Sequence, residues 1–224
     1  MYRIVRDDAE LLRFIDWLPE TRTDETFYIC LMARRKYHAA LPSASTQLAR
    51  IVVGKAGMYH AIRRLECPLG CYRVGHEEVP EDALALYVSP NPRDLRVAAY
   101  DTIAALSTTL KNGGRLAPHD EAVTCIQRAA RRRYVCFDYD GVDADADAVA
   151  REVPGDALTI VDTRGGFHAL VEPARLDPAQ RDFYQRLRAL PGLDQAGDLL
   201  LPVPGTTQGG VVPRMRAPPT PSGP

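Results

Sequence analysis

The sequence predicts a fold of the mixed α/β (α+β) class. Short apolar runs of strand length alternate along the 224 residues with longer segments in which apolar residues recur every three or four positions. The composition agrees, since 46% of the residues are hydrophobic and 25% are charged, as in a globular protein with a buried core. The length suits one domain or two small ones, and no internal repeat is detectable.

The first half of the chain carries two kinds of helix signal. Apolar spacing predicts one helix that ends before Pro19 and a long one interrupted by Gly54 and Gly57. Asn91 and Pro92 form a helix-start signal, a capping side chain followed by a ring already set for the first helical position. The elements expected in chain order are helix 11–18, strand 26–33, helix 45–65, strand 83–89, a helix with one apolar face that ends at 113–114, and helix 119–132.

The second half begins with the run YVCFDYD and reads β-α-β-β-α-β, the order of a ferredoxin-like or RRM-like unit. The expected elements are strand 134–140, helix 143–153, strands 158–162 and 167–171, helix 178–190 and a strand at 198–203. We therefore expect an N-terminal α/β unit (1–130) packed on an RRM-like unit (131–214). The Pro-rich tail 215–224 is expected to be disordered.

Overall charge gives no indication of a nucleic-acid or membrane partner. The 28 Lys and Arg residues balance 29 Asp and Glu residues, so any site for a polyanion must be a local patch. No run of 18 apolar residues occurs, and Met1 leads into a polar stretch instead of a signal core. The sequence therefore predicts a cytoplasmic protein without a membrane partner.

The five cysteines do not predict a disulfide framework, because their number is odd and three lie in or beside apolar segments. Cys67 and Cys71, with His76 downstream, raise the question of a zinc site. The spacing is looser than in a zinc knuckle, and a structural zinc site needs four ligands. A Pro-Gly turn flanked by two ordinary thiols is the favoured interpretation.

Asp138 and Asp140 are the first candidate site residues. Residues i and i+2 of a strand face the same way, so both carboxylates project from one face and Phe137 and Tyr139 from the other. Two carboxylates about 6 Å apart repel by roughly 2 to 3 kcal/mol at an effective dielectric of 20, so a compensating divalent cation is expected. The alternative is that both acids are solvated in the loop before Gly141.

Two later segments add candidate ligands. The segment TRGGFH (163–168) places His168 at a strand start, after glycines that allow a ligand to approach the backbone, with Arg164 beside it. The segment GDLLLPVPGTTQGG (197–210) begins with a third acid, Asp198, and ends in a turn of small polar residues. Taken singly, each could be structural: a strand-start histidine, a turn acid and a surface loop.

Together, FDYD, TRGGFH and GD…PVPGT resemble the three catalytic motifs of the archaeo-eukaryotic primase superfamily, the primase-polymerases. In that family a strand carries Asp-x-Asp, a small-x-His motif begins a later strand, and a third acid precedes a segment that often contains Pro-Gly-Thr. The resemblance covers about 134–210. The N-terminal part fits the family only by length and element order.

The resemblance implies a primase-like fold and a DNA-directed nucleotidyltransferase, a primase or polymerase that uses nucleoside triphosphates. Asp138, Asp140 and Asp198 would hold two Mg²⁺ or Mn²⁺ ions, and His168 would contact the phosphates. The further nucleotide contacts expected are Arg164, Gly166, Thr206 and Gln208.

A DNA template, single-stranded or primed, would need a basic surface, for which Arg34, Arg35 and Lys36 are the first candidates. Charge runs are more often solvated ends of helices or strands. The chain contains no GxxxxGK[ST] motif, so a helicase or other replication proteins would be separate partners, in a phage, plasmid or other mobile element.

Two other functions stay open. DYDG (138–141) is similar to the Asp-x-Asp-Gly motif of the aspartyl-nucleophile phosphatases, in which the first Asp forms a covalent intermediate. There the motif opens the domain, and here no clear later lysine and acidic pair follow. The other function is a non-catalytic module that binds nucleotides or DNA, recognisable by nucleotide binding without incorporation.

Overall fold

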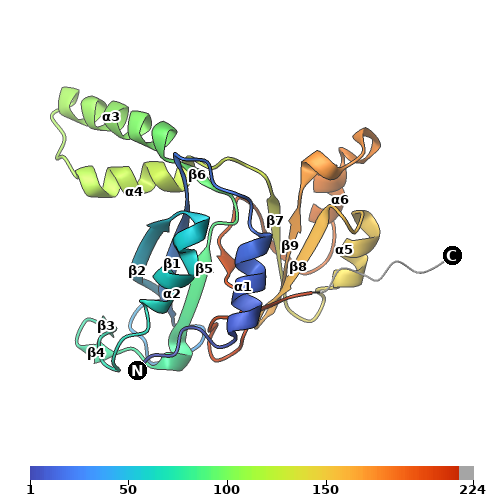
Figure 1. Cartoon of the computed structure of the whole chain (residues 1–224), viewed down its shortest axis with the longest axis horizontal. Helices are drawn as coiled ribbons and strands as arrows, with labels where there is room; N and C mark the ends of the chain where they lie inside the picture. Colours follow the sequence, from blue (N-terminus) through green and yellow to red (C-terminus); the bar gives the residue numbers. More distant parts are fainter. Residues whose placement is uncertain (217–224) are drawn as a thin grey trace.

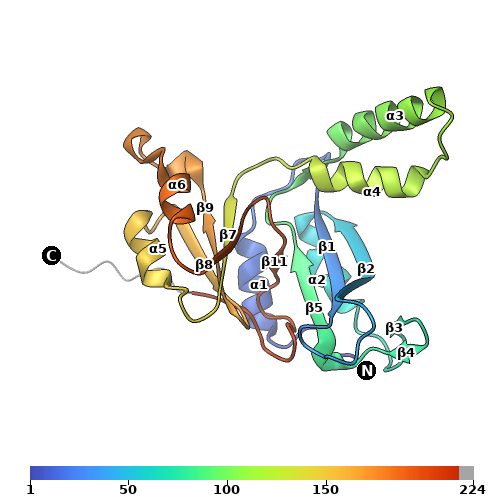
Figure 2. The ribbon, with the colours of Figure 1, turned by 180° about the vertical axis from the view of Figure 1, so that it is seen from behind.

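The structure, a computed structural model, describes residues 1–216. They form two five-stranded antiparallel sheets, with helix α1 (Asp8–Trp17) between them, and a third sheet of only two strands (Figures 1 and 2). The mixed class expected from the alternating pattern is therefore confirmed at the level of an α+β fold. Within the described part of the chain, no helix is both long enough and apolar enough to cross a bilayer.

The first sheet has the strand order β11-β5-β1-β2, and β6 pairs with the start of β1. Strand β1 is central and almost wholly buried, whereas β2 lies at an edge and alternates between partly buried and exposed side chains. That alternation is typical of a strand with one solvated face. The strands are β1 (Glu25–Arg34), β2 (Ser45–Val53), β5 (Leu84–Val88), β6 (Arg93–Asp94) and β11 (Leu201–Pro202).

The second sheet has the order β10-β7-β9-β8-β12, with every neighbouring pair antiparallel. From β7 to β10 the elements follow the expected order β-α-β-β-α-β. Its strands and helices are β7 (Val135–Asp140), α5 (Ala146–Glu152), β8 (Leu158–Asp162), β9 (Gly166–Val171), α6 (Phe183–Arg188), β10 (Leu193–Gly197) and β12 (Arg214–Met215). Helices α5 and α6 cover one face of this sheet, where Phe137 and Tyr139 pack against Val149 and Leu187.

The opposite face of the second sheet shares the main core with the first sheet. Cys136 and Leu170 come from the second sheet, Phe27 and Leu86 from the first, and Phe14 of α1 joins them. All five side chains are buried to within 1% exposure.

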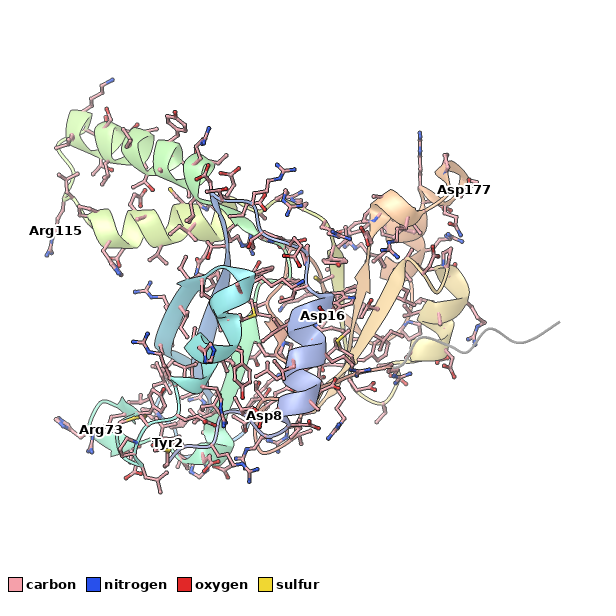
Figure 3. All side chains as sticks on the ribbon, in the orientation of Figure 1. Tyr2, Asp8, Asp16, Arg73, Arg115 and Asp177 are labelled. Carbon is pink, nitrogen blue, oxygen red and sulfur yellow. A yellow bond between two sulfur atoms is a disulfide. The ribbon has the colours of Figure 1, made fainter. Side chains whose placement is uncertain are left out.

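Helices α3 (Leu95–Lys111) and α4 (Pro118–Arg128) form an arm that projects from the body, with Arg115 near its tip (Figures 1 and 3). The helix with one apolar face is present, but that face does not enter the core: Ala98 is its one buried residue, and Ile103 and Leu110 are 66% and 61% exposed. The remaining short elements are α2 (Met58–Arg63), β3 (Arg73–Val74), β4 (Glu77–Glu78) and the 3₁₀ turns Lys55–Gly57, Glu81–Ala83, Pro173–Arg175 and Pro178–Gln180.

The expected long helix 45–65 is wrong for its first half. Residues 45–53 form strand β2, paired with β1 through Ile51↔Ile29 and Val53↔Phe27. Successive β-branched side chains at 51–53 lose rotamer freedom in a helix and pack well in a sheet. Gly54 and Gly57, which were expected to interrupt one long helix, instead lie between the end of β2 and the start of α2.

Two further boundaries differ from the sequence prediction. Asp94, not Asn91, caps helix α3, since its side chain accepts a hydrogen bond from the Val97 backbone N–H. The last strand of the β-α-β-β-α-β unit is 193–197, and the apolar run expected as that strand crosses over to form β11 beside β5 in the first sheet. Residues 201–202 therefore pair with the N-terminal sheet, and the chain returns to the second sheet at β12, although 131–214 was expected to form one unit.

The cysteines divide into two groups. Cys30, Cys125 and Cys136 are buried free thiols, as expected. Cys67 and Cys71 are joined as a disulfide across the Pro-Gly turn, so the expectation of two free thiols there is wrong. At the C-terminus, Met215 lies in β12, and the rest of the expected tail, 217–224, is outside the described residues.

Candidate metal centre

A cavity of about 670 Å³ lies between the two five-stranded sheets. Its size is in the range of small-molecule sites. Both sheets and the loops between them contribute to its lining, which includes four carboxylates, three cationic side chains and two tyrosines: Asp138, Asp140, Asp194, Asp198, Arg34, Lys36, Arg164, Tyr37 and Tyr87. His168 and Gln208 also line it.

Asp138 and Asp140 face this cavity from β7, while Phe137 and Tyr139 face the core beneath α5 and α6. The expected alternation is therefore confirmed, and the two acids are partly buried on a strand instead of solvated in a loop. Gly165 packs against Asp140, where an added Cβ would come within 2.7 Å of the carboxylate oxygen.

The third acid of the cluster is Asp194 on β10. The pairing of β10 with β7 shifts register between Leu193 and Gln195, so Asp194 sits at a bulge, a feature that re-aims a side chain. Ligand oxygens of Asp138, Asp140 and Asp194 lie within 4.8 Å of one another. These three residues could hold a metal ion, and hard oxygen donors of this kind suit a divalent cation.

Sequence reasoning missed Asp194 because it placed the last strand too late. An acid at 194 would have been a candidate once β10 was aligned with β7. No periodicity signal marks a bulge.

Negative charge is concentrated at Asp138. Burial, followed by the neighbouring Asp140 and Asp194, raises the pKa of Asp138 to about 7. Lys36 and Arg34 act in the opposite direction but do not compensate fully. A site that raises the pKa of a carboxylate in this way is one in which a bound cation would be stabilised.

His168 lies directly opposite Asp138 in the β7–β9 pairing, with Nε2 at 3.1 Å from Oδ1 of Asp138. Burial, helped by the nearby Lys36, lowers the pKa of His168 to about 4, so the ring is neutral at pH 7. The distance would fit an ion pair, but the contact is not one while the ring is neutral. Nδ1 of His168 is buried without a partner in the described residues.

Asp198, the acid expected to complete the metal site, is outside the cluster. Its carboxylate accepts hydrogen bonds from Asn91 Nδ2 at 2.8 Å and from a terminal guanidinium nitrogen of Arg93 at 2.5 Å. Asp198 still lines the cavity, and its side chain is 20% exposed. The structure thus places Asp194, and not Asp198, beside Asp138 and Asp140.

Three cationic side chains also line the cavity: Arg34, Lys36 and Arg164. Arg164 stacks over the Tyr37 ring, 4.9 Å from its centroid, and donates to the carbonyl of Gly209 at 2.8 Å. The Gln208 side chain accepts from the Arg164 backbone N–H at 3.0 Å. Within the described chain, neither Lys36 nor Arg164 forms an ion pair with a carboxylate, so both charges are available to a ligand.

Three expected contact residues do not line the cavity. An added Cβ at Gly166 would come within 2.0 Å of the Tyr139 carbonyl, so this glycine serves close packing of β9 on β7. Thr206 is fully buried, and its hydroxyl donates to the Val203 carbonyl at 2.7 Å. Arg35 is exposed to solvent away from the cavity.

Comparisons of the chain with protein-family models, with curated proteins and with solved structures returned no match.

Proposed function

We propose that the protein is a DNA-directed nucleotidyltransferase, a primase or primase-polymerase. It would add nucleotides from NTPs or dNTPs to a primer, or start primers, on a DNA template. The observation that carries the proposal is that one cavity is lined both by an acidic triad, Asp138, Asp140 and Asp194, and by cations that form no ion pair in the described residues, Lys36 and Arg164. The order of the motifs FDYD, TRGGFH and GD…PVPGT supports the same family of reactions.

The acidic triad would hold Mg²⁺ or Mn²⁺. Such ions, when bound, lower the pKa of an attacking hydroxyl and neutralise charge on the transferring phosphoryl group. Three converging carboxylates fit this task, and the raised pKa of Asp138 reflects negative charge that the protein alone leaves uncompensated.

The cationic side chains of the cavity would bind the triphosphate. Lys36 and Arg164 present positive charge in the same cavity as the acids, where the phosphate oxygens of a nucleotide held there would meet them. Neutral His168 lies with Nε2 at 3.1 Å from Oδ1 of Asp138 and so packs against that carboxylate. By the resemblance, the same histidine would also contact the phosphates of the incoming nucleotide.

The direct test measures incorporation of labelled NTPs and dNTPs on single-stranded and primed DNA with Mg²⁺ or Mn²⁺. Wild type is compared with the double variant Asp138→Ala/Asp140→Ala. We expect metal-dependent product from wild type and a loss of at least about 1,000-fold in the variant, since the two carboxylates would hold the metal ions that stabilise the transition state.

The matched control is Asp143→Ala/Asp147→Ala, which removes two exposed acids near the same strand. It should keep wild-type activity. If folded wild type binds nucleotide but yields no product on any template or metal, a non-catalytic nucleotide-binding module replaces the proposal. A trapped phosphoaspartate that disappears with Asp138→Asn would instead indicate a phosphatase.

A further inference from the structure

A buried polar cluster joins the two sheets at the start of β7, and the proposed reaction does not use it. It consists of Asn91, Arg93 and Asp198, here called the inter-sheet brace. Asn91 is fully buried and Arg93 is 3% exposed, and both lie in the segment that enters β6 of the first sheet. Asp198 follows β10 of the second sheet.

Asn91 uses its whole hydrogen-bonding capacity. Its Oδ1 accepts from the backbone N–H groups of Arg133 and Tyr134, at 2.9 and 2.8 Å. Its Nδ2 donates to the Tyr134 carbonyl at 3.0 Å and to Asp198 at 2.8 Å. An amide side chain offers two donors and two acceptor positions, so none is left over. Asn91 therefore fixes the backbone from which β7 begins.

The Arg93–Asp198 contact is an ion pair with little access to solvent. The two side chains are 4% and 20% exposed, and the nitrogen–oxygen distance is 2.5 Å. A buried guanidinium without its counter-charge is strongly destabilising. If Asp198 turned to a metal ion, it would leave Arg93 in that state, because Arg93 forms no other ion pair in residues 1–216.

Asp198 also marks the point at which the chain changes sheets. β10 ends at Gly197 beside β7, and β11 pairs with β5 of the first sheet. In Figure 2 the segment runs from the second sheet to a position beside β5. The brace thus holds the end of β10 as well as the start of β7, and these two strands carry the acidic triad.

We infer that Asn91, Arg93 and Asp198 are positioning residues, which hold β7 and β10 where Asp138, Asp140 and Asp194 converge, and that Asp198 is not a metal ligand. The inference rests on the metal site of the proposed function. It concerns metal affinity, which can be measured without any turnover.

The test is Mn²⁺ affinity, measured by calorimetry, with thermal unfolding to verify folding. Arg93→Met weakens the brace and frees Asp198. We expect its Mn²⁺ affinity to fall about tenfold, at the low end of the roughly 10- to 100-fold range found when residues behind metal ligands are changed. Adding Asp198→Asn to Arg93→Met should change the affinity by less than twofold, because the brace is already broken.

Two comparison variants complete the design. Asp194→Asn should lose at least about 30-fold in affinity, as a direct ligand. Arg96→Met removes an exposed arginine paired with Asp24 and should bind Mn²⁺ like wild type.

An Arg93→Met variant that binds Mn²⁺ as tightly as wild type or more tightly would overturn the inference. So would a further tenfold loss on adding Asp198→Asn. If wild type binds Mn²⁺ and the variants change its affinity as expected, but wild type incorporates no nucleotide, the proposed function fails and the inference about the inter-sheet brace holds. If wild type binds no Mn²⁺, both fail.

Discussion

The acidic residues and the cationic residues that line the cavity are held in place in different ways. The acidic side consists of Asp138, Asp140, Asp194 and His168 on three neighbouring strands of one sheet, where backbone pairing sets their spacing. The cationic side consists of loop residues such as Lys36 and Arg164, the latter held by a tyrosine ring and a backbone carbonyl. Acidic residues whose spacing is fixed by strand register are pre-organised for a ligand. Cationic side chains that are held by weak contacts can instead move onto a ligand.

The largest expected effect tests the rigidity of the acidic side. Gly166→Ala places a Cβ within 2.0 Å of the Tyr139 carbonyl, and the clash must move β9 from β7. We expect a loss of about 3 kcal/mol or more in the free energy of unfolding, measured by chemical denaturation. Gly54→Ala is the control, since its Cβ would meet Thr21 at an ordinary 3.6 Å. Equal stability of the two variants would contradict close packing at Gly166.

The second prediction concerns the pH dependence of stability without metal. The folded-state pKa of Asp138 is about 7, above the usual 3.8, so its charged form is disfavoured by folding. The cost is absent below pH 4, grows as pH rises, and is complete above pH 7, where it amounts to about 2 to 4 kcal/mol.

Asp138→Asn should therefore stabilise the metal-free protein at pH 8 and have little effect at pH 4, as followed by unfolding at both pH values. Added Mn²⁺ should reverse the ranking at pH 8, because only wild type keeps the full triad. If the substitution destabilises equally at both pH values, charge strain at Asp138 is not the cause.

A third, smaller effect is expected on the cationic side. Lys36→Ala should raise the KM for nucleotide about five- to tenfold and change kcat less, since it removes one phosphate-binding charge. The adjacent Arg35→Ala should leave KM within twofold, because Arg35 does not line the cavity. Steady-state kinetics of the two variants separates them. A similar KM increase in both variants would indicate that these positive charges act on the nucleotide at long range, and not through a defined contact of Lys36 with the phosphates.

The smallest effect is expected on the arm formed by α3 and α4. Tyr100→Ser and Ile103→Ser alter side chains that are 70% and 66% exposed. Each should change stability by less than about 0.5 kcal/mol and leave nucleotide KM unchanged. Thermal unfolding is the measurement, and a drop of several degrees would mean that the arm folds back on the body.

The acidic side was the more predictable from sequence, for a physical reason. Strand alternation is local, so two acids separated by one residue predict a shared face at Asp138 and Asp140. Asp194 was missed because a bulge obeys no period, and the strand was placed beyond it. Its neighbour in sequence, Asp198, satisfied the motif but is held by Asn91 and Arg93, which are distant in sequence.

Long-range contacts explain the remaining differences. Asn91 carries a helix-capping signal, yet burial between the sheets uses its amide for four other hydrogen bonds. Residues 45–53 have mixed helix and strand character in the sequence. They form strand β2 because they pair with the buried strand β1. The apolar stripe of α3 predicts a helix correctly, but periodicity alone does not reveal whether a stripe meets the core.

The most direct test of the metal site is an anomalous diffraction map from crystals grown with Mn²⁺ and a non-hydrolysable nucleoside triphosphate. We expect a Mn²⁺ peak coordinated by Asp138, Asp140 and Asp194, with the triphosphate extending to Lys36 and Arg164 and Asp198 still paired with Arg93. Mn²⁺ bound elsewhere, or coordinated by Asp198 with Arg93 released, would contradict it.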